Sequence, residues 1–391
     1  MTAPRAVPLL AALTLAACAS GARRTSDSAM PSPHLAGVSE RALRVYRDAF
    51  VVDTHNDMPS KVVDDGYDPD VRHEPGFGPQ TGHTDLPRLI ESGLTAEFMS
   101  AFVDAPFART TPDSSFERAM RLSDSVHAFV SRHPDRLLFA TTAADVRRAK
   151  REGKVAILIG VEGGHAIENS LDNLRALHRR GVRYLTLTWN NGNDWAGSSV
   201  GLDSTSTGGL TEFGREVVRE MNRLGMLVDV SHVSESTFFD AVAASRQPVI
   251  ASHSSARALN DHPRNLTDAQ LLAVKRNGGV VNVNFFSRFI DPKVLRAFEA
   301  SQEPLPTTPL SVLIDHIDHV AKVAGVDHVG LGSDFDGVSA LPEGMEDVTM
   351  LPKIAQALLD RGYSEGDVRK ILGGNMVRVM EQALDRVVAP D

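Results

Sequence analysis

The chain has 391 residues, of which 42% are hydrophobic and 23% charged, and this composition excludes a disordered, collagen-like or low-complexity protein. Acidic residues outnumber basic ones by 50 to 41, and the formal net charge of −9 argues against a nucleic-acid partner. A single cysteine excludes an internal disulfide and a cysteine-rich zinc module, and it leaves fourteen histidines as candidate metal ligands.

The first seventeen residues have the composition of a secretion signal. Arg5 is their only charge, and the apolar run over 7–17 is too short to span a bilayer, which takes about 20 residues. The run ends in Leu-Ala-Ala before Cys18, which resembles the box at which bacterial lipoproteins are cleaved and lipidated. We therefore predict a lipoprotein signal peptide over 1–17, a flexible tether over 18–37, and a lipid anchor at Cys18 on the periplasmic side of the cell envelope. Because Ala19 rather than an aspartate follows the cysteine, the outer membrane is favoured.

From residue 38 onward, short β-branched runs alternate with longer segments of helical period. Continuous apolar runs such as 155–159 and 226–230 are typical of strands buried on both faces of a parallel sheet. The predicted strands are 50–54, 94–101, 155–160, 182–188, 226–230, 248–252, 279–284 and 328–332. The clearest helical patterns lie at 170–180, 211–224, 266–277, 309–324 and 347–361.

Eight strands with intervening helices predict an α/β fold, a (β/α)8 TIM barrel that occupies residues 38–391 and ends in helices that pack on its outside. A doubly wound open sheet is the alternative, and the absence of a GxGxxG motif after the first strand disfavours it. Two long segments, 63–84 and 285–309, would lie at the carboxyl-terminal mouth of the barrel, where long loops form lids or specificity elements.

Histidines and acidic residues gather at five predicted strand ends, on the rim where a barrel holds its active site. A single histidine at a strand end is more often a hydrogen-bonded surface residue than a metal ligand. The prediction therefore depends on such residues occurring at five strand ends at once. One metal takes three or four protein ligands, and the number of candidates here predicts two divalent metals. Glycines follow Glu162 and leave room for ions, so we assign the bridging position to it. The candidates are His55, Asp57, Glu162, His232, His253 and Asp334.

Five segments resemble the motifs of the membrane (renal-type) dipeptidases, which are binuclear zinc enzymes of the amidohydrolase superfamily. They occur in the family's order and are 53–59 (DTHNDMP), 160–165 (GVEGGH), 229–234 (DVSHVS), 251–256 (ASHSSA) and 332–337 (GSDFDG). The resemblance implies that His55 and Asp57 bind one zinc, that His232 and His253 bind the second, and that Glu162 bridges both. Manganese or cobalt would suit the same ligand types.

The resemblance also implies roles for residues outside the ligand set. Asp334 would be the catalytic acid/base, and Arg264 would bind the carboxylate at the C-terminus of the substrate. Eukaryotic members carry a histidine that contacts the scissile carbonyl, and this chain has Trp189 at that position. Three asparagines follow, at 190, 191 and 193, as replacement donors, and we expect Trp189 and Asn193 to contact the substrate.

The predicted function is a binuclear zinc metallo-dipeptidase that hydrolyses dipeptides, D-residues at the C-terminal position included, by a metal-bridging hydroxide. Its partners would be a small amide substrate and the membrane, and homodimers occur in the resembled family. The alternative is another amidohydrolase-type reaction on the same metals, such as deacylation of an N-acyl amino acid or β-lactam hydrolysis. A non-catalytic envelope binding protein is a further alternative, whereas a serine hydrolase is disfavoured because no GxSxG motif occurs.

Overall fold

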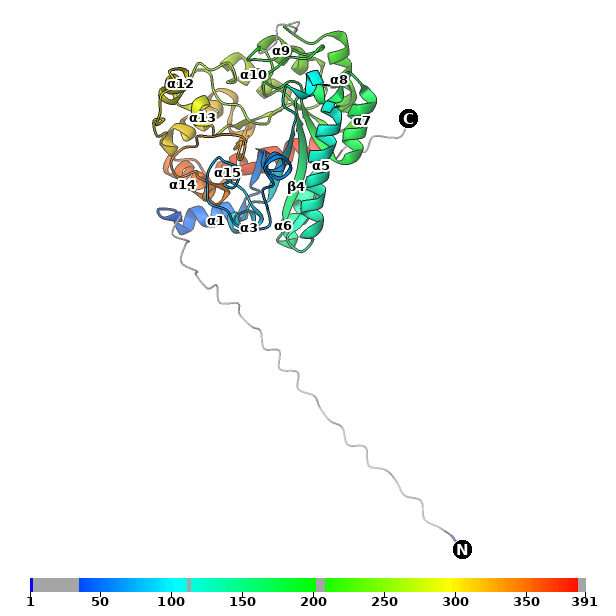
Figure 1. Ribbon diagram of the computed structural model, residues 1–391. Helices are drawn as coiled ribbons and strands as arrows, with labels where there is room; N and C mark the ends of the chain where they lie inside the picture. The colour runs from blue at the N-terminus through cyan, green and yellow to red at the C-terminus, as the bar shows by residue number, and fades with distance from the viewer. Residues whose placement is uncertain (3–34, 111–113, 202–207, 386–391) are drawn as a thin grey trace.

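Eight parallel strands close into a barrel, which confirms the predicted (β/α)8 fold (Figure 1). The computed structural model describes residues 1–2, 35–110, 114–201 and 208–385, so the predicted signal core and Cys18 lie outside the described residues. The ring closes because β1 pairs with both β2 and β9, and β2 pairs with β4. In ring order the strands are β1 (Val52–Asn56), β2 (Ala96–Phe102), β4 (Val155–Glu162), β5 (Val182–Thr186), β6 (Leu227–Asp229), β7 (Ile250–Ala251), β8 (Val280–Val283) and β9 (Val329–Leu331).

Each predicted strand overlaps one strand of this ring. A further strand, β3 (Leu137–Phe139), was not predicted from the sequence. It pairs with the first half of β4, where Leu137 lies opposite Val155, while β5 pairs with the second half of β4. β3 therefore extends the edge of one strand and does not belong to the closed ring.

Helices cover the outside of the ring, and the five predicted helical segments are confirmed within a few residues at their ends. In Figure 1, α5, α7 and α8 lie along the side of the barrel next to β4, and α12 and α13 lie on the far side. The helices are α1 (Glu40–Asp48), α2 (Met58–Ser60), α3 (Leu86–Ser92), α4 (Phe107–Thr110), α5 (Ser114–Arg132), α6 (Ala143–Glu152), α7 (Leu171–Arg180), α8 (Glu212–Leu224), α9 (Glu235–Ala244), α10 (Asp268–Asn277), α11 (Ser287–Ile290), α12 (Pro292–Glu299), α13 (Leu310–Ala324), α14 (Pro352–Asp360), α15 (Glu365–Arg369) and α16 (Asn375–Ala383). Within the described ranges, no helix is long and apolar enough to cross a bilayer.

Local signals explain where these helices begin and end. α10 begins with a capping box, in which the Thr267 side chain accepts from the Gln270 N–H and the Gln270 side chain accepts from the Thr267 N–H. Gly278 ends the same helix with φ of 84°, a left-handed conformation that a glycine adopts without steric cost.

The barrel interior and the bottom of the barrel share one hydrophobic cluster. Inward-facing side chains such as Phe98 and Leu158 pack in the same cluster as Met376 and Met380 of α16. α16 therefore covers the amino-terminal end of the ring, whereas α14 packs outside against α1, as predicted for the C-terminal helices. The wide end left for ligands is the carboxyl-terminal mouth.

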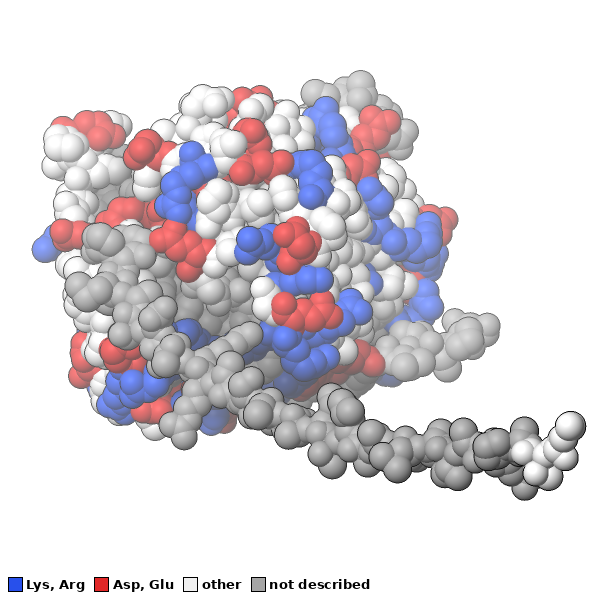
Figure 2. Space-filling view, turned by 90° about the horizontal axis from the view of Figure 1, so that it is seen from below, with Lys and Arg blue, Asp and Glu red and all other residues white. Residues whose placement is uncertain are grey.

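The side of the molecule that includes α1 and α6 has mixed charge. Figure 2 views the molecule from below, and Lys and Arg side chains are interspersed there with Asp and Glu. Arg41 of α1 pairs with Glu365, and Arg147 of α6 pairs with Glu381 of α16. Such paired charges are typical of a solvated surface.

Candidate metal centre

Four strand ends bring the five predicted metal ligands together at the mouth of the barrel. His55 belongs to β1 and Asp57 follows it directly, while Glu162 is the last residue of β4. His232 and His253 follow β6 and β7, and all five side chains are at most 7% exposed. Five polar side chains that are buried together without a Lys or Arg among them indicate a shared ligand.

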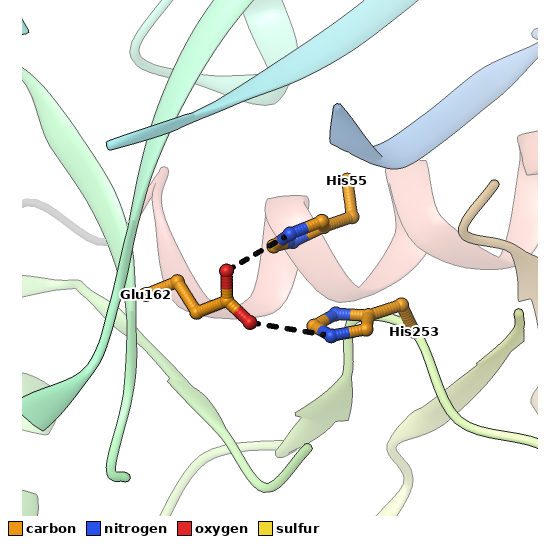
Figure 3. A group of neighbouring side chains, drawn as sticks. All are labelled: His55, Glu162 and His253. Atoms are coloured by element: carbon orange, nitrogen blue, oxygen red, sulfur yellow. Dashed lines mark ion pairs between the residues drawn. The ribbon is translucent and has the colours of Figure 1, made fainter. Parts of the chain in front are cut away.

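Glu162 lies at the centre of this group. Its Oε1 lies 2.7 Å from His232 Nε2 and 3.5 Å from His253 Nε2, and its Oε2 lies 3.4 Å from His55 Nε2. Figure 3 shows the rings of His55 and His253 turned toward the two oxygens of this carboxylate. Each oxygen thus faces a different group of nitrogen ligands, which is the arrangement a bridging carboxylate needs.

The nitrogen and oxygen atoms of these side chains are arranged to bind divalent metal ions rather than to hydrogen-bond with one another. His232 Nε2 and His253 Nε2 lie 2.8 Å apart, and both point their lone pairs or protons at the same space. His55 Nε2 and Asp57 Oδ1 are buried and have no hydrogen-bond partner among the described residues. Such buried, unsatisfied atoms require an explanation, and convergent imidazole and carboxylate groups are the ligands that zinc and related ions take.

Two overlapping groups of three residues have ligand atoms close enough together to bind one metal ion each. In each, one ligand atom per residue lies within 4.8 Å of the others. One group is His55, Glu162 and His253, and the other is His55, Asp57 and Asp334. The second group shows that Asp334 lies close enough to the ligands to act on a group bound by them.

A tyrosine that sequence reasoning missed holds His55 in place. The Tyr184 hydroxyl lies 2.9 Å from His55 Nδ1, which leaves Nε2 directed at the carboxylates. Gly160 of β4 makes room for this ring, because a Cβ at that position would lie 1.9 Å from the Tyr184 ring. The available signal was a tyrosine inside the predicted strand 182–188.

The other two histidines are also oriented through Nδ1. His232 Nδ1 lies 3.0 Å from Asn190 Oδ1, and His253 Nδ1 lies 2.8 Å from Ser252 Oγ. Ser252 in turn donates to Asp229 Oδ2 at 2.6 Å. Groups that fix the free nitrogen of a ligating histidine set its tautomer and its direction. Sequence reasoning did not predict these contacts, although an aspartate inside the apolar run 226–230 marked Asp229 as unusual.

Burial and charge set the protonation of the site. Burial, together with the nearby Arg264 and His55, holds the pKa of His232 well below its usual value. Burial, together with His55, Arg264 and His232, also holds the pKa of His253 well below its usual value. Both imidazoles are therefore neutral and have a lone pair available for a metal. Burial raises the pKa of Glu162 to about 7, against the lowering effect of His55.

Asp334 lies beside Asp57 in a strained turn after β9. Its φ is 64°, a left-handed value that is uncommon for a non-glycine residue and that clusters at functional sites. A Cβ on Gly337 would lie 2.6 Å from Asp334 Oδ1 and 2.2 Å from Asp57 Oδ2, so only glycine fits above the two carboxylates. Asn284 donates to Asp334 Oδ2 at 2.8 Å and leaves Oδ1 on the side of Asp57. Burial raises the pKa of Asp334, and Asp57 adds to this effect.

Arg264 is a buried cation without a carboxylate partner among the described residues. It is 2% exposed, and it donates to the backbone carbonyl of His253 at 3.2 Å and to Ser254 Oγ at 3.5 Å. The ring of Phe289 lies 5.4 Å from its guanidinium carbon. Burial lowers the pKa of Arg264 to about 10. The nearby carboxylates of Glu162, Asp334 and Asp229 oppose this effect, but none of them pairs directly with the guanidinium. A buried guanidinium without a direct ionic partner fits an anionic ligand.

The loop after β5 contains Trp189 and Asn193, the two residues that the sequence predicts to contact the substrate. Trp189 and Asn190 line a cavity of about 590 Å³ above the metal ligands. Asn193 does not line it, because its amide nitrogen donates to Leu187 O and its amide oxygen accepts from the N–H groups of Trp195 and Ala196. The Asn193 side chain is therefore bound to the backbone of its own loop, whereas the Asn190 side chain lies at the cavity.

Comparisons with known proteins point to one family. A sequence profile described as membrane dipeptidase (peptidase family M19) matches residues 39–387. The probable dipeptidase PvdM from Pseudomonas aeruginosa is 25% identical, with a TM-score of 0.79, and the match covers 89% of this chain and 98% of PvdM. The metallopeptidase called dipeptidase AC is 31% identical, with a TM-score of 0.74 and coverage of 86% and 99%.

A third similar structure contains a ligand. It is a metallopeptidase from Rhodobacter sphaeroides bound to a phosphinate mimic of the dipeptide L-Ala-D-Ala. It is 29% identical to this chain, with a TM-score of 0.74, and the match covers 85% of this chain and 99% of that one.

Proposed function

The chain belongs to the membrane dipeptidase family, and on this premise we propose that it is a binuclear zinc enzyme that hydrolyses dipeptides, including those with a D-residue at the C-terminus. One observation carries the proposal: His55, His232 and His253 come from three strand ends and converge on Glu162 at the end of a fourth, with Asp57 beside His55. The R. sphaeroides relative, bound to an L-Ala-D-Ala mimic, supports the D-residue.

In this proposal two groups of ligands share one carboxylate. His55 and Asp57 would hold one ion and His232 and His253 the other, with one oxygen of Glu162 facing each pair. When bound, two such ions lower the pKa of a water molecule toward neutrality and polarise the scissile carbonyl. Zinc is proposed from the family and the ligand types, which also suit manganese and cobalt.

The remaining polar side chains then have defined tasks. Asp334, held through Oδ2 by Asn284, would accept a proton from the attacking water at Oδ1 and return it to the amine of the departing residue. Arg264 would bind the carboxylate of the C-terminal residue through its planar fork of N–H groups. A substrate with a free carboxylate two bonds from its scissile nitrogen fits this distribution of charge.

The experiment is a hydrolysis assay on the purified full chain, before and after metal removal. We expect cleavage of L-Ala-L-Ala and L-Ala-D-Ala, loss of both activities with a chelator, and recovery on adding zinc. A protein that holds metal but cleaves neither dipeptide would contradict the proposal. N-acetyl-alanine and a chromogenic β-lactam in the same panel test the alternative amidohydrolase reactions, because both also carry a carboxylate for Arg264.

We also propose that the enzyme is a lipoprotein of the bacterial outer membrane, anchored at Cys18 on the periplasmic side. The sequence supports this, since an apolar run of signal-peptide length ends directly before the single cysteine. Metabolic labelling with a radioactive fatty acid tests the proposal. The parent chain should carry label and sediment with membranes, and Cys18→Ser should lose both properties; label retained by the variant would contradict it.

A further inference from the structure

Aromatic rings are concentrated around the cavity above the metal ligands. Five of the 20 residues that line it are aromatic, against 6% of the whole chain. They are Phe77, Phe102, Trp189, Phe286 and Phe289. Metal binding and proton transfer do not require these rings, so their concentration indicates that part of the ligand is apolar.

Four of the rings form two walls. Phe102 at the end of β2 meets Trp189 edge to face, with centroids 4.9 Å apart and planes at 61°, and we call this pair the β2–β5 wall. Phe286 meets Phe289 in the same way after β8, with centroids 4.9 Å apart. β2 and β5 flank β4 in the ring, and β8 is the strand opposite β4. The two walls therefore face each other across the mouth, with Glu162 between them.

The position of Arg264 orients a dipeptide between these walls. Arg264 does not itself line the cavity, but its guanidinium carbon lies 5.4 Å from the ring of Phe289, which does. A carboxylate bound to this guanidinium therefore places the C-terminal residue on the β8 side. The scissile bond must lie over Glu162, and the N-terminal residue then extends toward the β2–β5 wall. The Trp189 ring reaches the edge of the ligand cluster, because its centroid is 6.5 Å from that of His232.

The charged side chains at the rim on this side already have partners. Lys61 Nζ donates to Gly78 O at 2.5 Å and lies 3.9 Å from Asp65. Asp64 accepts two hydrogen bonds from Arg118, at 2.6 and 2.5 Å. Neither Lys61 nor Asp64 offers an uncompensated charge to a charged substrate side chain, whereas the half-buried rings of the wall offer apolar surface that a side chain would remove from water.

We propose that the β2–β5 wall selects dipeptides whose N-terminal residue carries a large apolar side chain. This inference rests on the proposed dipeptidase function. Trp189 stands where eukaryotic members of the resembled family carry a histidine, and Phe102 holds its ring in an edge-to-face contact. The wall thus acts on the residue that supplies the scissile carbonyl, while Arg264 acts on the residue that leaves.

The test compares kcat/KM for Phe-Ala, Leu-Ala, Gly-Ala and Asp-Ala on the zinc-loaded full chain. We expect the parent enzyme to favour Phe-Ala over Gly-Ala by at least about tenfold, the order of discrimination that an apolar pocket supplies. Trp189→Ala should lower kcat/KM for Phe-Ala by about tenfold and that for Gly-Ala by less than about threefold. Phe102→Leu is a milder second variant that should shift the ratio in the same direction.

Phe239→Ala is the matched control. Phe239 of α9 also meets a neighbouring ring edge to face, that of Phe238 at 5.3 Å, but it does not line the cavity. Its loss should leave the Phe-Ala to Gly-Ala ratio unchanged. Equal kcat/KM for the two substrates in the parent enzyme, or an unchanged ratio in folded Trp189→Ala and Phe102→Leu, would overturn the inference and leave the dipeptidase function standing. Failure of the parent enzyme to cleave any dipeptide would overturn both.

Discussion

Replacing Arg264 with methionine should weaken substrate binding and stabilise the fold at the same time. The guanidinium is 2% exposed and donates only to neutral oxygens. Burial lowers its pKa from an ordinary value above 12 to about 10, which corresponds to about 3 kcal/mol for keeping the charged form buried. Below pH 10 the group is protonated in both the folded and the unfolded chain, so the full cost is present at neutral pH.

The effect on catalysis has the opposite sign. A substrate carboxylate that pairs with the buried guanidinium loses this partner in Arg264→Met, and such a loss costs about 2–5 kcal/mol. This corresponds to a fall in kcat/KM of roughly 30-fold to several thousand-fold, mostly through KM, because the interaction is present before the chemical step. A dipeptide amide has no carboxylate, so its slower hydrolysis should change little.

Two measurements check this prediction on the parent and variant at equal zinc loading. The first is kcat/KM for L-Ala-L-Ala and for its C-terminal amide. The second is the free energy of unfolding in urea at pH 7, which we expect to be higher in the variant because methionine fills similar space without a charge. An equal loss of kcat/KM for the acid and the amide would refute the carboxylate contact. A variant less stable by several kcal/mol would refute the description of Arg264 as a buried charge without a direct ionic partner.

Three further predictions concern buried polar side chains. Asp334→Asn should lower kcat by about 10²- to 10⁴-fold and leave the metal content unchanged, because it removes a proton acceptor; metal analysis beside the rate checks this, and loss of metal would make Asp334 a ligand instead. Tyr184→Phe should weaken metal binding by about 10- to 100-fold, because it removes the hydroxyl 2.9 Å from His55 Nδ1; competition with a zinc-sensitive chelator measures this, and unchanged affinity would contradict it. Glu97→Gln should stabilise the fold above pH 4.5, because burial, with the nearby Asp53 and Asp336 carboxylates, raises the pKa of Glu97 well above 4.5.

The sign of the last prediction follows from proton binding. Above pH 4.5 the unfolded chain releases the Glu97 proton and the folded chain keeps it, so stability falls by about 1.4 kcal/mol per pH unit until the folded pKa is reached. Both carboxylate oxygens are buried and have no hydrogen-bond partner among the described residues, so glutamine loses no contact. Urea unfolding from pH 4 to pH 8 measures the slope, and an identical slope in the two proteins would contradict the argument.

The barrel could be predicted because its strands are marked by local composition. Runs such as 155–159 are apolar throughout, and their alternation with helical periods determines the fold class. β3 could not be predicted in this way, since three residues that pair only with the first half of β4 have no periodicity of their own. α5 has a usable signal that sequence reasoning did not exploit, because its buried Leu122, Val126 and Phe129 follow the spacing of a helix face.

The metal ligands could be predicted because their chemistry and their strand-end positions are both local properties. Contacts between strands are not local: the pairing of Tyr184 with His55 depends on a ring of eight strands and on the space above Gly160. Loop conformation limited the rest, because Asn190 and Asn193 have the same side chain and only the turn after β5 directs one to the cavity and the other to the backbone.

Anomalous diffraction at the zinc edge, on crystals of the zinc-loaded chain, tests the central claim most directly. The account predicts two peaks, each about 2 Å from one oxygen of Glu162, one beside His55 and Asp57 and the other beside His232 and His253. A single peak, or peaks that do not contact Glu162, would contradict it.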